Sequence, residues 1–133
     1  MSAKALEILF GMVRVGAAAA LALSLAGMLA PAASLPRQLP PDLILHAVGF
    51  GVPTMLACFA AARRELRIEA IVLIAAAGCV GELAQGLVPS RTVSALDLLA
   101  NVVGIGCGAW LGWMGRAALL EMARLLSAPR AQS

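Results

Sequence analysis

Charge and aromatic rings are scarce in this chain of 133 residues. Asp, Glu, Lys and Arg make up 13% of it, tyrosine is absent and histidine occurs once, whereas ordinary soluble domains carry about 25% charged residues. So little charge excludes a disordered chain and a soluble enzyme, and three cysteines are too few for a disulfide scaffold. Hydrophobic residues reach 62%. The composition predicts a single all-α domain embedded in a membrane.

Four long runs with almost no charge predict four transmembrane helices in one domain, residues 1–127. They cover about 12–30, 43–62, 70–88 and 98–115. Roughly 20 residues cross about 30 Å of hydrocarbon, because a helix rises 1.5 Å per residue. Pro31 is expected to end the first helix near Ala30. The first run also fits a cleaved signal peptide, with Ala30-Pro31-Ala32 as the cleavage pattern.

Basic residues predict the orientation of this integral membrane four-helix bundle. Eight of them flank the spans on one side, namely Lys4, Arg14, Arg63, Arg64, Arg67, Arg116, Arg124 and Arg130. The other side has two, Arg37 and Arg91. The positive-inside rule therefore predicts that both termini are cytoplasmic. This scattered pattern fits membrane topology better than a nucleic-acid-binding stripe, so no nucleic-acid partner is expected.

Two features flank or line the last predicted span. Residues 116–127 form an expected amphipathic helix that either lies flat on the inner membrane surface or extends the span. Residues 128–133 are expected to be disordered. Gly104, Gly108 and Gly112 repeat every four residues, which lets another helix approach closely, either within the monomer or between two copies in an oligomer.

Polar side chains gather at one depth, in the predicted outer half of the membrane. Three helices and one short loop each contribute a pair, which in chain order are Asp42 and His46, Glu82 and Gln85, Arg91 and Ser94, and Asp97 and Asn101. Spacings of three or four residues place both members of each helical pair on one face. We interpret these eight residues as a candidate binding site.

Glu82 is the most demanding member of this set. A charge near the centre of a span costs roughly 2.5–3.5 kcal/mol, so Glu82 should face the bundle and not lipid. Its available cations are His46 and Arg91. An ionisable group inside a membrane suggests a functional site. The alternative is structural, with polar groups joining the helices and with Asp42 and Ser94 as helix caps.

The same residues form a pattern that resembles the VanZ-like membrane proteins. It reads Asp42-x-x-x-His46, Glu82-x-x-Gln85, and Pro89-Ser90-Arg91-x-x-Ser94-x-x-Asp97-x-x-x-Asn101-x-x-Gly104. Leu43 stands where that family often has lysine. Any role that the lysine has in the family therefore does not carry over to this chain. The resemblance implies a multi-pass protein of the bacterial inner membrane. The founding member is associated with low-level resistance to the glycopeptide teicoplanin, and most members have no defined biochemical activity.

Three functions are compatible with this site. It could bind an amphiphilic envelope molecule, such as a lipid-linked precursor or a lipophilic glycopeptide, with Arg91 contacting its phosphate or carboxylate. It could instead be a catalytic site, with His46 as general base and Asp42 orienting it. Glu82 would then be a carboxyl group removed from water by burial, and Ser94 would be the available nucleophile. The third possibility is a structural protein that acts through partners. No cofactor is expected, and one histidine without a nearby cysteine predicts no metal site.

Overall fold

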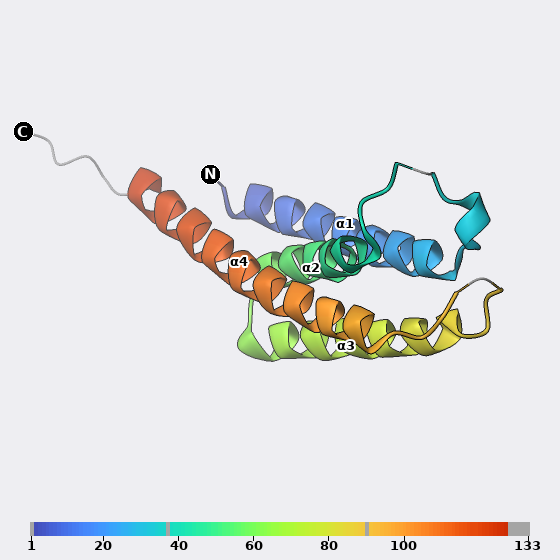
Figure 1. Ribbon diagram of the computed structural model, residues 1–133. Helices are drawn as coiled ribbons and strands as arrows, with labels where there is room; N and C mark the ends of the chain where they lie inside the picture. Colours follow the sequence, from blue (N-terminus) through green and yellow to red (C-terminus); the bar gives the residue numbers. More distant parts are fainter. Residues whose placement is uncertain (1, 37, 90, 128–133) are drawn as a thin grey trace, which may run out of the picture.

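The computed structural model describes residues 2–36, 38–89 and 91–127, and it is helical throughout its regular elements (Figure 1). In chain order the elements are α1 (Ala3–Leu29), the short 3-10 helix η1 (Ala32–Ser34), α2 (Asp42–Ala60), α3 (Arg64–Gln85) and α4 (Ala95–Ser127). The all-α, four-helix prediction is confirmed. Arg37, Ser90 and the predicted disordered tail at 128–133 lie outside the described residues.

Local chemistry explains where α1 begins and ends. The side chain of Ser2 caps the helix, since the Ala5 amide donates a hydrogen bond of 3.2 Å to its Oγ. The helix ends at Leu29, two residues before Pro31, as predicted. The helix begins upstream of the predicted span at about 12–30, because a helix can continue past the charged residues that mark the edge of the hydrocarbon.

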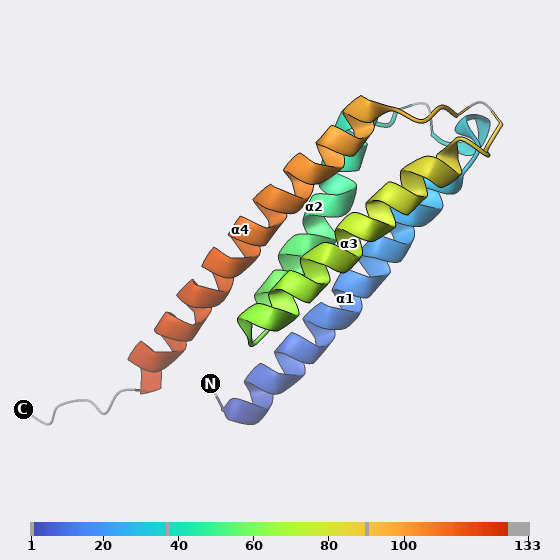
Figure 2. The same ribbon diagram turned by 90° about the horizontal axis from the view of Figure 1, so that it is seen from below.

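α4 is one continuous helix of 33 residues (Figures 1 and 2). Residues 116–127 therefore extend the last predicted span, and the alternative of a separate helix lying flat on the membrane is wrong. At 1.5 Å per residue, α4 is about 50 Å long, well beyond the roughly 30 Å of a hydrocarbon layer. Its last turns consequently reach past the membrane-spanning part of the bundle.

Three helices, α1, α2 and α4, are long and apolar enough to cross a membrane. α3 is not among them. Its first turns are charged and its remaining stretch runs only from 70 to 85, about 24 Å. The predicted end at 88 is thus three residues too late. The outer face of α3 is nevertheless apolar, with exposed side chains that include Val72, Leu73, Val80 and Leu83. A fourth crossing by α3 remains a prediction.

α2 is the central helix, which packs against each of the other three and most extensively against α4. Glycine allows this close approach. A Cβ atom at Gly104, Gly108 or Gly112 of α4 would overlap the backbone oxygens of Ala47, Gly51 and Met55 in α2, respectively. The glycine face thus packs within the chain. An oligomer through this face is incompatible with the fold, because α2 already covers it.

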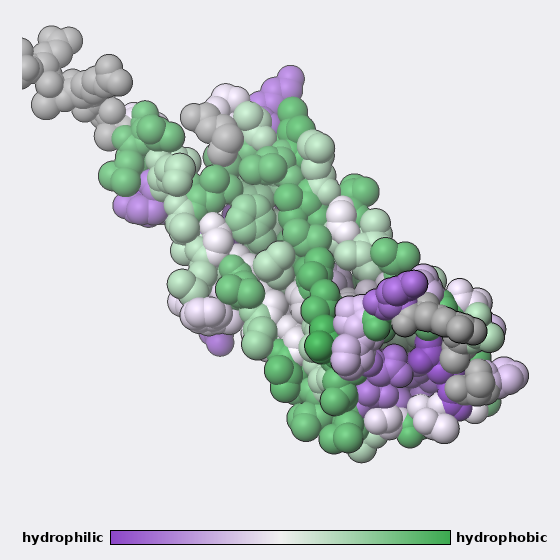
Figure 3. All heavy atoms as spheres, turned by 45° about the horizontal axis from the view of Figure 1, so that its top comes forward, coloured by the Kyte–Doolittle hydropathy of each residue, from purple (hydrophilic) through white to green (hydrophobic). Residues whose placement is uncertain are grey.

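The start of α1 and the end of α4 lie at the same end of the bundle (Figure 1). The α1–α2 and α3–α4 connections lie at the opposite end, which we call the loop end (Figures 1 and 2). On the face that Figure 3 shows, hydrophobic residues cover the helical sides and hydrophilic residues gather at the loop end. This distribution suits a bundle surrounded by lipid, with one polar end well separated from its termini.

Candidate functional site

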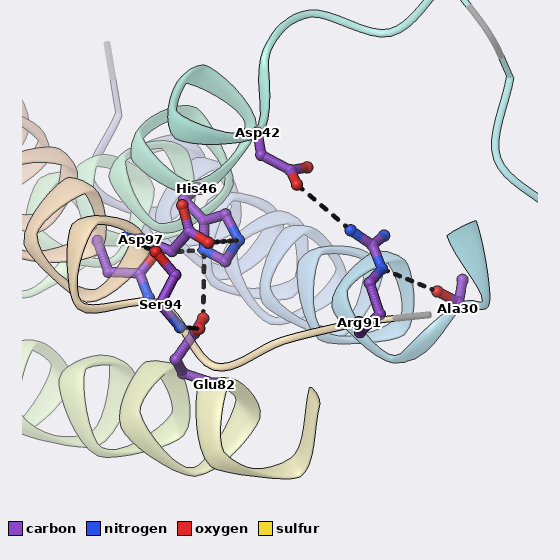
Figure 4. A network of polar contacts seen from close by, with 8 residues as sticks. Ala30, Asp42, His46, Glu82, Arg91, Ser94 and Asp97 are labelled. Carbon is purple, nitrogen blue, oxygen red and sulfur yellow. Dashed lines mark hydrogen bonds and ion pairs between the residues drawn. The ribbon is translucent and has the colours of Figure 1, made fainter. Parts of the chain in front are cut away.

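Four predicted site residues meet just inside the loop end, and Figure 4 labels three of them, His46, Glu82 and Asp97. His46 comes from α2, Glu82 from α3, and Asp97 and Asn101 from α4. We call this group the His46 cluster. His46 and Asn101 are buried, and Glu82 is 0% exposed. The close α2–α4 contact brings His46 and Asn101 together at one level along the bundle.

His46 is the centre of the cluster. Its Nδ1 lies 3.0 Å from Asn101 Oδ1, so an N–H at Nδ1 donates to that amide oxygen. The same nitrogen is 4.0 Å from Glu82 Oε2, and Nε2 is 4.0 Å from Asp97 Oδ2. One ring nitrogen therefore faces each carboxylate. With a proton on Nδ1, the lone pair of Nε2 points toward Asp97.

Only one of the two carboxylate oxygens of Glu82 has a hydrogen-bond partner among the described residues. Its Oε1 accepts a 2.6 Å hydrogen bond from the backbone amide of Ser94, which holds the α3–α4 connection against α3. Its Oε2 is buried and has no hydrogen-bond partner among the described residues. The Ser94 hydroxyl accepts from the Asp97 amide at 3.3 Å, so Ser94 caps the start of α4, as the capping alternative predicted.

Arg91 and Asp42 form a separate, shallower pair (Figure 4). Arg91 donates to Asp42 Oδ2 at 3.5 Å and to the Ala30 carbonyl oxygen at 3.4 Å, which ties the α3–α4 connection to the end of α1. The Asp42 side chain is 58% exposed. The prediction that Arg91 could neutralise Glu82 is therefore wrong. Asp42 also does not orient His46, since Asn101 takes that place.

A cavity of about 360 Å³ lies between α1 and α2 beside the cluster. Its walls are largely apolar and include Leu23, Met28, Leu35, Leu45 and Phe50. Its polar end is formed by Asp42, His46, Gln85 and Arg91. Gln85 is buried, and its Oε1 has no hydrogen-bond partner among the residues that the structure describes. The volume is within the range of small-molecule sites.

Sequence reasoning missed the contribution of α1 to this cavity. Leu23, Gly27 and Met28 line it together with Leu35 of the following connection. These residues are apolar, as are the lipid-facing residues of the same helix. No signal in the sequence separates the two groups, because α1 carries no polar periodicity that would mark its inner face.

Comparison with known proteins identifies no relative of this chain. None of the protein-family models, curated proteins or solved structures compared with this chain matches it. The resemblance to VanZ-like membrane proteins therefore remains a prediction from the motif residues. Local geometry is what bears on function: a buried cluster of ionisable groups lies beside an apolar cavity at the loop end of a membrane bundle.

Proposed function

We propose that this protein binds an amphiphile with an anionic head in the cavity between α1 and α2. The observation that supports this is the division of the cavity into apolar walls and one polar end, which holds Arg91, His46 and Gln85. An amphiphile needs both parts. The proposed class includes a lipid-linked precursor of the bacterial envelope and a lipophilic glycopeptide such as teicoplanin, the latter from the VanZ-like resemblance.

Arg91 is the proposed contact for the head. A guanidinium group donates two parallel hydrogen bonds to phosphate or carboxylate. Its present partner, Asp42, is half exposed and 3.5 Å away, and ion pairs of that kind contribute about 0–1 kcal/mol. An incoming anion therefore displaces Asp42 at little cost, and the released carboxylate is solvated at the loop end.

Gln85 strengthens the case for a polar head at this position. Its buried Oε1 has no hydrogen-bond partner among the described residues, and a buried acceptor without a partner costs about 1–3 kcal/mol. A hydroxyl or amide on a ligand head would supply the missing donor. Carboxamide and guanidinium groups together suit a head that carries both an anion and hydroxyl or amide groups.

The apolar walls accept the chain of the amphiphile. Leu23 and Val48 line the cavity, and both are exposed on the lipid-facing sides of the helices. A chain can therefore enter sideways from the membrane. Moving a chain from lipid into an apolar cavity gains little, because both environments are apolar. Most of the binding free energy and the specificity must come from the head.

Binding of a long-chain polyprenyl phosphate to the purified protein in detergent, measured by native mass spectrometry, tests this proposal. Arg91→Ala should weaken binding at least tenfold while the protein still accumulates. Gly27→Leu should block the cavity, since Gly27 lines it and a Cβ there has no atom within 4 Å. The matched control, Arg64→Ala, removes an exposed arginine at the opposite end of α3 and should leave binding unchanged.

Two further probes separate head from chain and one ligand class from another. The uncharged polyprenol of equal chain length should bind far more weakly than the phosphate. Teicoplanin in place of the lipid tests the glycopeptide. Equal binding of alcohol and phosphate, or wild-type binding by both Arg91→Ala and Gly27→Leu, would refute the proposal.

A further inference from the structure

We infer that His46, Glu82 and Asp97 form a binding site for a divalent metal ion. One potential ligand atom from each residue lies within 4.8 Å of the other two. The three residues come from α2, α3 and α4 and converge on one point (Figure 4). The sequence predicted no metal because it holds a single histidine, but two carboxylates complete the set once the helices are packed.

The charges of the cluster favour a divalent cation. Glu82 and Asp97 carry two negative charges when ionised, whereas protonation of His46 supplies one positive charge. Among the described residues, no Lys or Arg forms an ion pair with either carboxylate, since Arg91 is paired with Asp42. Uncompensated charge is strongly unfavourable inside a membrane bundle. A divalent ion with neutral His46 balances both carboxylates.

An unpartnered oxygen independently points to a missing ligand. Glu82 Oε2 is buried, has no hydrogen-bond partner among the described residues and faces His46 at 4.0 Å. The other oxygen, Oε1, is held by the Ser94 amide. The carboxylate is thus fixed in orientation with one oxygen left free. Such an arrangement is typical of a metal-binding carboxylate supported by an outer hydrogen bond.

Asn101 prepares His46 for the same role. By accepting a hydrogen bond from Nδ1–H at 3.0 Å, Asn101 Oδ1 sets the ring orientation and leaves the Nε2 lone pair free. Metal-binding histidines usually donate their other N–H to an oxygen in this way. Nε2 faces Asp97 Oδ2 at 4.0 Å. An ion beside Nε2 therefore meets the Asp97 carboxylate first, and Glu82, whose Oε2 lies 4.0 Å from the other ring nitrogen, Nδ1, joins it by a side-chain rotation.

The distances allow closure around an ion. Metal–nitrogen and metal–oxygen bonds of about 2.0–2.2 Å place two ligand atoms roughly 3–4 Å apart. The three ligand atoms lie within 4.8 Å of one another, so closure needs a contraction of up to about 1–2 Å, which side-chain rotations supply. One imidazole nitrogen with carboxylate oxygens suits Mn²⁺ or Zn²⁺. Water fills the remaining coordination positions.

Metal binding is tested on the full chain, purified in detergent, stripped with EDTA and then freed of the chelator. Mn²⁺ or Zn²⁺ is added without any amphiphile, so that this result is independent of the proposed lipid binding. Bound metal is measured by elemental mass spectrometry after desalting, and thermal unfolding is followed in parallel. We expect one equivalent of metal per chain and an upward shift of the melting temperature.

Variants locate the site. Glu82→Gln and Asp97→Asn should each weaken metal binding at least tenfold and abolish the thermal shift. Asp42→Asn removes a half-exposed carboxylate outside the cluster and should retain both. If the wild type retains no stoichiometric metal, the proposal fails whatever the variants do. Wild-type metal binding by both Glu82→Gln and Asp97→Asn would also overturn it.

Discussion

The stability of Glu82→Gln in metal-free protein distinguishes a functional cluster from a structural one. Glutamine has the shape of glutamate and retains an oxygen for the hydrogen bond from the Ser94 amide, which is 2.6 Å long in the wild type. The substitution therefore changes the charge and little else. If the cluster joins the helices, this change should destabilise the protein. If the charge is retained for binding, its loss should not.

The electrostatic terms can be worked from the structure with both carboxylates ionised and His46 protonated. At an effective dielectric constant of about 20, the 4.0 Å approach of Glu82 to His46 is worth about 4 kcal/mol of attraction. Glu82 and Asp97 offer atoms within 4.8 Å of each other, which corresponds to at least about 3.5 kcal/mol of repulsion. The two terms nearly cancel, so the desolvation of the buried carboxylate decides the outcome.

We therefore expect Glu82→Gln to raise the free energy of unfolding by about 1–2 kcal/mol in EDTA, because a buried charge is removed. His46→Ala should lower it by about 3–5 kcal/mol, since the buried Glu82 and the partly buried Asp97 carboxylates then face each other without a cation. Thermal unfolding in detergent, followed by circular dichroism, measures both. The expected shifts are a few degrees per kcal/mol.

Glu121→Gln is the matched control. Glu121 is exposed and pairs with Arg124 three residues along α4 at 3.5 Å, so its substitution should change stability by about 0.5 kcal/mol or less. A loss of more than about 2 kcal/mol in Glu82→Gln, with Glu121→Gln unchanged, would refute the reasoning. The buried charge would then be a structural contact, and the search for function would move to protein partners.

Two further predictions concern the packing that supports the site. Gly108→Ala should lower the free energy of unfolding by about 1–3 kcal/mol, because its Cβ would overlap a backbone oxygen of α2. Gly106→Ala has open space and should not, so equal melting temperatures of the two variants would contradict the α2–α4 contact. Arg116→Ala removes a 2.9 Å hydrogen bond to the Phe59 carbonyl oxygen. Amide hydrogen exchange at the end of α2 should therefore accelerate, and exchange at the wild-type rate would show that this bond does not hold the helix end; Arg124→Ala is the exposed control.

The helices, and the helix faces that carry the polar residues, follow from local sequence alone. Long uncharged runs have no stable form in lipid other than a helix with all its backbone groups paired. Pro31 ends α1 because its ring disfavours the helical conformation of the residue before it. Spacings of three and four residues place Glu82 with Gln85, and Asp97 with Asn101, on single helix faces. These features depend on each helix alone.

Which of these groups touch depends on how the helices pack. Spacing sets the height and face of a residue on its own helix, but a contact between helices also depends on their rotation and separation. The α2–α4 distance is set by backbone contacts at Gly104 and its neighbours, and it brings Asn101 to His46. Asp42, one turn from His46 along α2, instead pairs with Arg91.

The cavity also depends on packing. The residues of α1 that line it are of the same apolar types as those that face lipid, so composition cannot separate them. The unpartnered oxygen of Glu82 could not be predicted from the sequence either. The Ser94 amide binds the other oxygen only after the α3–α4 connection has folded back on α3. Contacts between segments far apart in the chain, which no local pattern encodes, decided the shape and charge of the site.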